Sequence, residues 1–247
     1  MPRGAVAAAA RRVGVARGQL TIGLLGTFDA LDAGSPLGLP MNGQRLLAFL
    51  ALQRRWVLRS FVAGSLWLDS TEDRAAGSLR SSLWRVNREA PFVETRGEQM
   101  RLAPAVSVDV DDAIDQAHRL LDPDGSECPS PNSVLLRDDL LPDWYDDWVA
   151  LERERLRQLR VHALEQLCER LIVAERFGEA TEAGLAAART EPFRESAQRL
   201  LIRIHLAEGN QSEALTYFRR FEKMLRDELG LAPSSKLTQL VAHLTNR

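Results

Sequence analysis

The second half of the chain contains an internal repeat with a period of 34 residues. Leu167 recurs as Leu201, and the pair Glu179-Ala180 recurs as Glu213-Ala214. This period is typical of tetratricopeptide repeats, in which paired helices stack and each pair buries an apolar face against the next. Residues that end helices fall between the expected segments, at Pro192, Gly209 and Gly230. The repeat therefore predicts an all-α, tetratricopeptide-like domain that includes residues 144–244.

The first half predicts a different, α+β architecture. Residues 19–31 are apolar and punctuated by glycines, and a Gly-Ser-Pro turn follows at 34–36, so we expect a small antiparallel sheet that ends near Leu39. Three helices should follow, because apolar residues recur there with helical spacing. Their expected starts are Asn42 and Ser60 as capping residues, and the stretch from Thr71 to Arg74.

A hairpin is predicted after the third helix, which Pro91 ends. Residues 92–95 and 100–102 are expected to be strands on either side of Arg96-Gly97-Glu98, where the glycine supplies a positive φ. A sheet, three helices and a hairpin in this order are typical of a winged helix-turn-helix. The predicted fold class is thus an N-terminal winged helix-turn-helix followed by an all-α helical-repeat domain.

The third helix, from about Asp73 to Glu89, has two contrasting faces. Its apolar stripe consists of Leu79, Leu83, Val86 and Ala90. Its opposite face consists of Arg80, Ser81, Trp84, Arg85 and Arg88. Arginine suits bidentate contacts with guanine O6 and N7, and it also binds phosphates. We expect this face to enter the DNA major groove; the alternative is an ordinary solvated helix face.

Further candidates for DNA contacts lie outside this row. Arg96 and Arg101 flank the expected hairpin tip, and Arg45 and Arg74 lie near expected helix N-termini, where they suit phosphate contacts. Each of these arginines also has an interpretation as a plain surface residue. Trp84 has two open interpretations, which are stacking on DNA and packing against a neighbouring helix or another protomer.

The charge distribution supports a division near residue 110. The whole chain has a formal net charge of -2. Residues 1–110 contain 14 basic and 9 acidic residues, a net charge of +5, whereas the remainder has 18 basic and 25 acidic residues, a net charge of -7. Such asymmetry indicates a basic binding module joined to an acidic module that faces protein. We expect a flexible tail at residues 1–17, a DNA-binding domain at 18–110 and a helical domain at 111–247.

No pattern of catalytic or metal-ligating residues is recognisable. The two cysteines, Cys128 and Cys168, lack metal-ligand spacing, and we expect reduced thiols. The only lysines, Lys223 and Lys236, do not form a phosphate-binding P-loop motif. We therefore expect no metal, no cofactor and no enzymatic activity. Trp144, Tyr145 and Trp148 are expected to pack in the core or between domains, and residues 122–133 to form a loop.

Membrane association is not expected either. The longest apolar run, Leu46 to Leu52, is far too short to span a bilayer. The N-terminal segment is apolar before it is basic, which is the wrong order for a secretory signal. These features predict a cytoplasmic, nucleoid-associated protein.

Both halves carry motifs of a known family. The chain resembles the Streptomyces antibiotic regulatory protein family, which joins an OmpR-type winged helix to a bacterial transcriptional activator domain. In the first half the motifs are Gln44-Arg45-Leu46-Leu47-Ala48, Val62-Ala63-Gly64-Ser65-Leu66-Trp67 and Leu79-Arg80-Ser81-Ser82-Leu83-Trp84-Arg85-Val86. In the second half they are Leu140 to Val149, Glu191 to Glu195, His205 to Asn210 and Asp227 to Ser234.

The resemblance implies a transcription activator. Such proteins bind direct repeats in double-stranded promoter DNA as homodimers or side-by-side protomers and recruit RNA polymerase holoenzyme through its σ factor, usually at antibiotic or other secondary-metabolite gene clusters. The chain departs from the family at Asn87, where the recognition helix often has a further arginine. Larger relatives append an ATPase or phosphopeptide-binding module, and because none follows residue 247 we expect no nucleotide control. The alternatives are a protein-interaction adaptor and a repressor.

Overall fold

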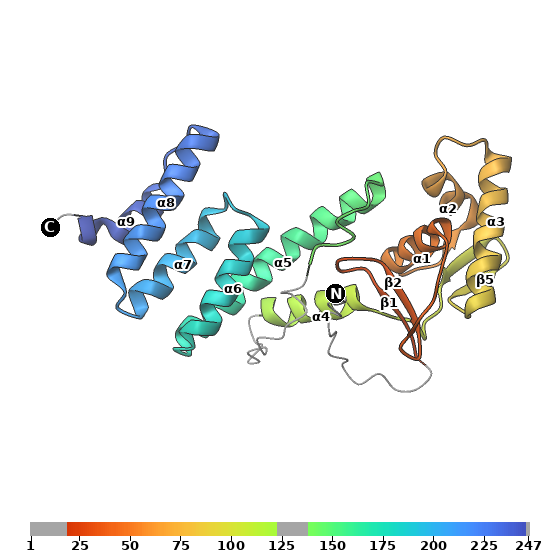
Figure 1. Cartoon of the computed structure of the whole chain (residues 1–247), viewed down its shortest axis with the longest axis horizontal. Helices are drawn as coiled ribbons and strands as arrows, with labels where there is room; N and C mark the ends of the chain where they lie inside the picture. The colour runs from red at the N-terminus through yellow and green to blue at the C-terminus, as the bar shows by residue number, and fades with distance from the viewer. Residues whose placement is uncertain (1–18, 123–137, 246–247) are drawn as a thin grey trace, which may run out of the picture. The chain divides into compact units, whose positions relative to one another are not determined.

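The computed structural model describes residues 19–122 and 138–245 (Figure 1), and the chain divides into two compact units after Asp109. The expected tail at residues 1–17, the expected loop from residue 123 onward and Cys128 lie outside the described residues.

The N-terminal unit begins with a four-stranded sheet in the order β3-β2-β1-β7. Strands β1 (Leu20–Gly23) and β2 (Asp29–Asp32) pair antiparallel, as predicted, and β3 (Ser35–Pro36) pairs antiparallel with β2. The turn expected at residues 34–36 is wrong for Ser35 and Pro36, because the chain already reverses at Ala33-Gly34, where both residues have a positive φ. The fourth strand, β7 (Ser107–Val108), was not predicted, and it pairs parallel to β1. The Asp109 carboxylate accepts hydrogen bonds from the backbone N–H groups of Leu24, at 2.9 Å, and Leu25, at 3.0 Å. These bonds fasten the end of β1 to the residue that follows β7.

Three helices follow the first hairpin strands: α1 (Met41–Gln53), α2 (Arg59–Leu66) and α3 (Glu72–Glu89). Residues Leu46 to Ala51 of α1 are all buried, so this helix forms the centre of the unit. A Cβ atom on Gly43 would lie 3.1 Å from Val86 Cγ2, and the glycine thus allows α1 and α3 to approach closely.

Two predicted helix caps are wrong. Pro40 and Leu58 hold the N-cap positions of α1 and α2, so Asn42 and Ser60 lie inside the first turns instead. The physical reason at α1 is that the extended backbone of Pro40 (φ -67°, ψ 154°) already starts the helix. A proline pre-sets such a φ without needing its own N–H, whereas the capping prediction considered side chains alone.

The hairpin that follows α3 consists of β5 (Val93–Arg96) and β6 (Gln99–Leu102), with Gly97 at φ 57° in the turn. The hairpin and the positive φ of its glycine confirm the prediction. A third strand, β4 (Val57–Leu58), pairs antiparallel with β6 and was not predicted. Three helices and this hairpin form the predicted winged helix.

The C-terminal unit is helical wherever its elements are described, as predicted. Its helices are α4 (Asp109–Leu121), α5 (Asp147–Val173), α6 (Phe177–Thr190), α7 (Glu195–Ala207), α8 (Gln211–Leu229) and α9 (Ser235–Thr245). Helices α5 to α8 pack in sequence order, each against the next. Ala117 and Leu120 of α4 join the apolar core of α5 to α7. His118, on the same helix, is exposed.

The 34-residue repeat extends to individual backbone hydrogen bonds. The N–H of Arg176 donates to the carbonyl of Leu171 at 2.9 Å, and 34 residues later the N–H of Asn210 donates to that of His205 at 2.8 Å. These bonds close the turns that follow α5 and α7, and each turn places one residue in the left-handed region. That residue is Gly209 (φ 81°) after α7 but Glu175 (φ 56°) after α5. A third such turn follows α8, where Gly230 (φ 66°) holds the predicted C′ position.

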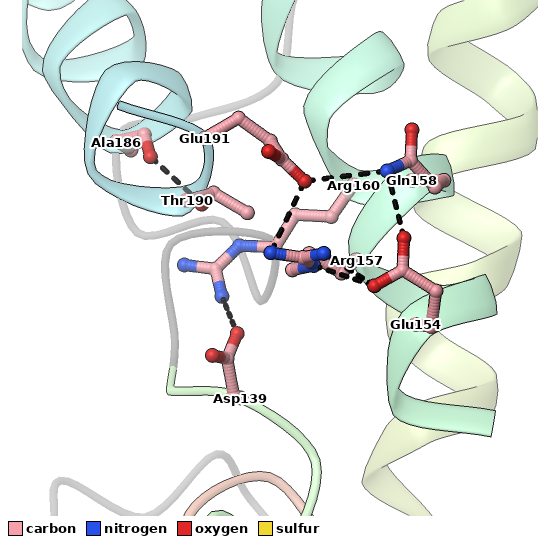
Figure 2. Close-up of polar contacts among 8 residues, drawn as sticks. All are labelled: Asp139, Glu154, Arg157, Gln158, Arg160, Ala186, Thr190 and Glu191. Atoms are coloured by element: carbon pink, nitrogen blue, oxygen red, sulfur yellow. Dashed lines mark hydrogen bonds and ion pairs between the residues drawn. The ribbon is translucent and has the colours of Figure 1, made fainter. Parts of the chain in front are cut away.

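A polar network joins α5 to the end of α6 (Figure 2). Arg157 forms an ion pair with Glu191 at 3.2 Å, and the Gln158 amide donates to Glu191 at 3.2 Å and to Glu154 at 2.9 Å. The hydrogen bond from Gln158, and secondly that from Arg157, lower the pKa of Glu154. These contacts hold the helices in register, with the Arg157 guanidinium shared between the carboxylates of Glu154 and Glu191.

The segment before α5 is held by arginines of that helix. Arg153 donates from Nε to the carbonyl of Leu140 at 2.7 Å and from Nη2 to that of Trp144 at 2.8 Å, and it also donates to the carbonyl of Leu141. Arg160 pairs with Asp139 at 3.3 Å (Figure 2). Of the two expected placements of the aromatic cluster, packing in the core is wrong for Tyr145, whose surface is 90% exposed. Trp144 and Trp148 pack edge to face, with ring centroids 6.3 Å apart.

Candidate nucleic-acid interface

Helix α3 presents its predicted outward face to solvent. Arg80, Ser81, Trp84, Arg85 and Arg88 are all exposed. Leu79 and Val86 are buried on the opposite side, and Leu83 is half-buried. Arg74, also exposed, lies seven residues before Ser81 and therefore on the same stripe of the helix as Ser81 and Arg85. The structure thus brings six of the nine predicted site residues onto one helix.

Most guanidinium groups on this face have no hydrogen-bond or ion-pair partner among the described residues. Within residues 19–122 and 138–245, Arg74, Arg80 and Arg85 form no hydrogen bond or ion pair. Arg88 pairs with its neighbour Glu89 at 3.3 Å, but its side chain is 63% exposed, so this contact is weak. The row can therefore bind anions without first breaking strong internal contacts.

Trp84 is largely exposed on α3, and its two interpretations, stacking on DNA and packing against a neighbouring helix or another protomer, stay predictions. Its surface is 61% exposed, and the Arg88 guanidinium lies 5.0 Å from its ring centroid. Together with Arg80, Leu83 and Asn87, these two side chains line a shallow depression. An aromatic face beside guanidinium groups is chemically suited to a planar or anionic ligand.

Asn87 links α3 to the hairpin. Its side-chain amide donates to the carbonyl of Val93 at 3.0 Å and its oxygen accepts from the N–H of Val93, also at 3.0 Å. An arginine has no acceptor atom and cannot reproduce this pair of bonds. At the position where the family often has arginine, this chain instead has a residue that fixes strand β5 beside α3 (Figure 1).

The hairpin arginines converge on a tryptophan that sequence reasoning missed. The guanidinium carbons of Arg96 and Arg101 lie 5.0 Å and 4.5 Å from the ring centroid of Trp56. Arg101 also donates to the Glu94 carboxylate at 2.9 Å and 2.8 Å. The signal that was available is a tryptophan directly after Arg54-Arg55, an aromatic residue beside basic residues. Its partners depend on strand register, which the sequence does not display.

Arg45 is the one predicted site residue that lies neither on α3 nor on the hairpin, because it belongs to α1. It is half-buried on α1 and takes part in a further interaction within the protein, so it is not a free cation.

Residues 19–122 and 138–245 contain no cluster of three or more side chains suited to a metal ion. Cys168 is buried, and burial raises the pKa of its thiol to about 12, which keeps it in the unreactive thiol form. No described helix is both long enough and apolar enough to cross a membrane.

Comparisons with known proteins show which proteins this chain is similar to. Residues 134–245 match the bacterial transcriptional activator domain. The chain is 25% identical over 241 residues to the regulatory protein AfsR of Streptomyces coelicolor, a match that covers 90% of this chain and 24% of AfsR. Its fold is similar to that of Mycobacterium tuberculosis EmbR, solved in complex with a low-affinity phosphopeptide, with a TM-score of 0.73 and 20% identity over 92% of this chain and 65% of EmbR.

The chain thus spans about a quarter of the length of AfsR and less than two thirds of the EmbR chain. The likeness to EmbR confirms the fold, a winged helix before tetratricopeptide-like helices. The matched C-terminal domain, and the likeness to AfsR over 90% of this chain, agree with the motifs in both halves. Residues 134–245 are thus similar to the bacterial transcriptional activator domain and the chain is similar to AfsR, which agrees with a resemblance to the Streptomyces antibiotic regulatory protein family.

Proposed function

We propose that the chain is a sequence-specific DNA-binding transcription activator in which α3 enters the major groove. The observation that carries this proposal is the row of exposed, uncommitted arginines on α3. An α-helix fits the major groove, and arginine can bind guanine through two hydrogen bonds. In this proposal Arg80, Trp84 and Arg85 face base edges, and Arg74, Ser81 and Arg88 also reach phosphates.

The hairpin and α1 supply supporting contacts in the same proposal. Arg96 and Arg101 contact the DNA backbone or minor groove next to the site of α3, and Arg45 contacts a phosphate from α1. Contacts of this kind fix the register of the protein on the duplex but do not read sequence. The DNA-binding domain comprises residues 18–110 in this proposal, which agrees with the net charge of +5 over residues 1–110.

The helical domain, proposed as residues 111–247, contacts protein. Its net charge of -7 disfavours an approach to DNA phosphates and favours a protein partner. We infer that it recruits RNA polymerase holoenzyme through the σ factor and packs against a neighbouring protomer on direct repeats. The family points to a pathway-specific regulator of a secondary-metabolite gene cluster, in the cytoplasm and without enzymatic activity.

Footprinting on the intergenic DNA beside the gene tests the proposal. We expect two or more protected direct repeats whose centres are about 10–11 base pairs, or a multiple of that, apart, because adjacent protomers would then lie on the same side of the duplex. Run-off transcription from the protected promoter should increase when the protein is added. A folded protein that protects no DNA would overturn the proposal, and a decrease in transcript would identify a repressor.

A further inference from the structure

One face of the small sheet β4-β6-β5 gathers charged and aromatic side chains in register. Arg101 of β6 stands opposite Glu94 of β5, and Gln99 stands opposite Arg96. On the other side of β6, Val57 of β4 pairs with Met100, so the next position places Trp56 opposite Arg101. Because side chains alternate along a strand, this face is opposite the one that buries Met100.

The contacts on this face hold two guanidinium groups beside one aromatic ring. Those of Arg96 and Arg101 both lie within 5.0 Å of the Trp56 centroid, and Arg96 also donates to the Gln99 side chain at 3.1 Å. Two cations this close repel each other, and the ring and Glu94 offset that repulsion. With one carboxylate for two guanidinium groups, the cluster keeps a net charge of +1.

The Glu94 carboxylate accepts hydrogen bonds from the same Arg101 donors that a phosphate would use. Its Oε2 atom accepts from both Nε and Nη2 of Arg101, at 2.9 Å and 2.8 Å. Carboxylates and phosphates use the same forked donors of arginine. The two side chains are 34% and 45% exposed, so an incoming anion can reach the pair.

We propose that this cluster is a binding site for a DNA backbone phosphate, in which Trp56 is a positioning residue and Glu94 an internal competitor. Trp56 holds both guanidinium groups over the outer face of the hairpin. Glu94 fills the donors of Arg101 until a DNA phosphate displaces it. The inference rests on the proposed DNA binding and adds to it a device that weakens non-specific binding.

The test uses the full chain and duplex DNA of unrelated sequence, because phosphate contacts do not depend on sequence. Glu94→Gln removes the competing charge, and Glu98→Gln is the matched control. Glu98 lies in the turn of the same hairpin and changes charge equally, but no described contact joins its side chain to an arginine. We expect Glu94→Gln to bind several-fold more tightly than the control, with a slope of log affinity against log salt that is steeper by about 1.

A double-mutant cycle shows whether the gain acts through Arg101. In an Arg101→Ala background, the advantage of Glu94→Gln over Glu98→Gln should disappear. If Glu94→Gln gains no more than Glu98→Gln, or if its gain survives the loss of Arg101, the proposal is overturned. A wild-type protein that binds no duplex would instead overturn the DNA-binding function itself, so the two failures are distinguishable.

The role of Trp56 has its own measurement. Trp56→Ala should weaken duplex binding and make the salt slope shallower, whereas Trp56→Phe should restore most of both because it keeps an aromatic face. Thermal unfolding identifies variants that lose the fold. If Trp56→Ala folds and binds duplex DNA with the salt slope of the wild type, Trp56 is not a positioning residue. If Trp56→Ala does not fold, the same measurement on Trp56→Leu decides the question.

Discussion

Helices α3 and α5 are both rich in arginine, but they use it in opposite ways. On α5, Arg153 and Arg170 donate to backbone carbonyls, and Arg155, Arg157 and Arg160 pair with carboxylates. On α3, Arg74, Arg80 and Arg85 have no such partner among the described residues. Arginine content therefore says little about function. What distinguishes the two helices is whether each guanidinium already has a hydrogen-bond or ion-pair partner within the protein: such partners on α5 stabilise the fold, whereas the unpaired groups on α3 can bind an external ligand.

The difference has a simple electrostatic basis. A guanidinium that is already hydrogen-bonded must give up those bonds before it can bind an external anion. An exposed, unpaired guanidinium gives up only water, and in binding DNA it releases condensed counterions. Substitutions on α5 should therefore change stability, and substitutions on α3 should change binding.

Salt gives the largest expected effect. If the α3 row and the hairpin contact 6–10 phosphates, DNA affinity should fall by roughly 10³–10⁵ between 50 and 200 mM salt. Fluorescence anisotropy with a labelled duplex measures the affinity, and thermal unfolding at the same salt concentrations is the control for the fold. A DNA affinity that does not change with salt would contradict the role of the α3 arginines in binding phosphates, and with it the proposed difference between α3 and α5.

Removal of Arg153 gives the largest expected effect on stability. Arg153→Met keeps much of the apolar stem but leaves the carbonyls of Leu140, Leu141 and Trp144 without their donor, so unfolding in urea should become easier by about 3 kcal/mol. Arg155→Met, at an exposed pair with Glu152, is the matched control and should cost less than about 1 kcal/mol. Equal losses for both variants would contradict the role assigned to Arg153.

Removal of Arg85 should affect DNA binding alone. Arg85→Ala should weaken binding to the protected promoter by about 1–3 kcal/mol if the side chain contacts a base. The melting temperature should stay near that of the wild type, because the side chain is exposed and unpaired among the described residues. Arg155→Ala is the control on α5, and unchanged affinity in Arg85→Ala would exclude Arg85 from the interface.

A turn of the helical repeat offers a smaller change of the opposite sign. Glu175 lies in the left-handed region at the position where the next repeat has Gly209, so Glu175→Gly should stabilise the unit by about 1 kcal/mol. Gly209→Ala should destabilise it by a similar amount. Urea unfolding measures both, and DNA affinity should not change; a loss of stability in Glu175→Gly would show that the Glu175 side chain makes a needed contact.

The sequence predicted the parts of the molecule that follow a regular period or a special φ. The apolar stripe of α3, the glycine of the hairpin turn and the 34-residue repeat were all recognisable, because each depends on residues close together in the chain or at a fixed spacing. Strands β4 and β7 have two residues each, which is too short for a period to be visible. They are defined only by their pairing with distant strands.

The same limit applies to the interface. The outward residues of α3 follow from helical periodicity. The contacts of Trp56 and Glu94 with Arg101 depend on how three strands align, and the contacts of Asn87 depend on how a helix meets the hairpin. Such contacts between elements arise from the tertiary structure and have no local sequence pattern.

The parallel pairing of β7 with β1 determines how far the N-terminal unit can be truncated from its C-terminal end without losing part of its sheet. A fragment that stops at Ala103, directly after the hairpin, would keep α3 and every hairpin arginine but would lose β7. It would also lose the Asp109 carboxylate, leaving the N–H groups of Leu24 and Leu25 without their acceptor. A self-sufficient DNA-binding fragment therefore has to extend through Asp109, so its first strand and its last residues fold together or not at all.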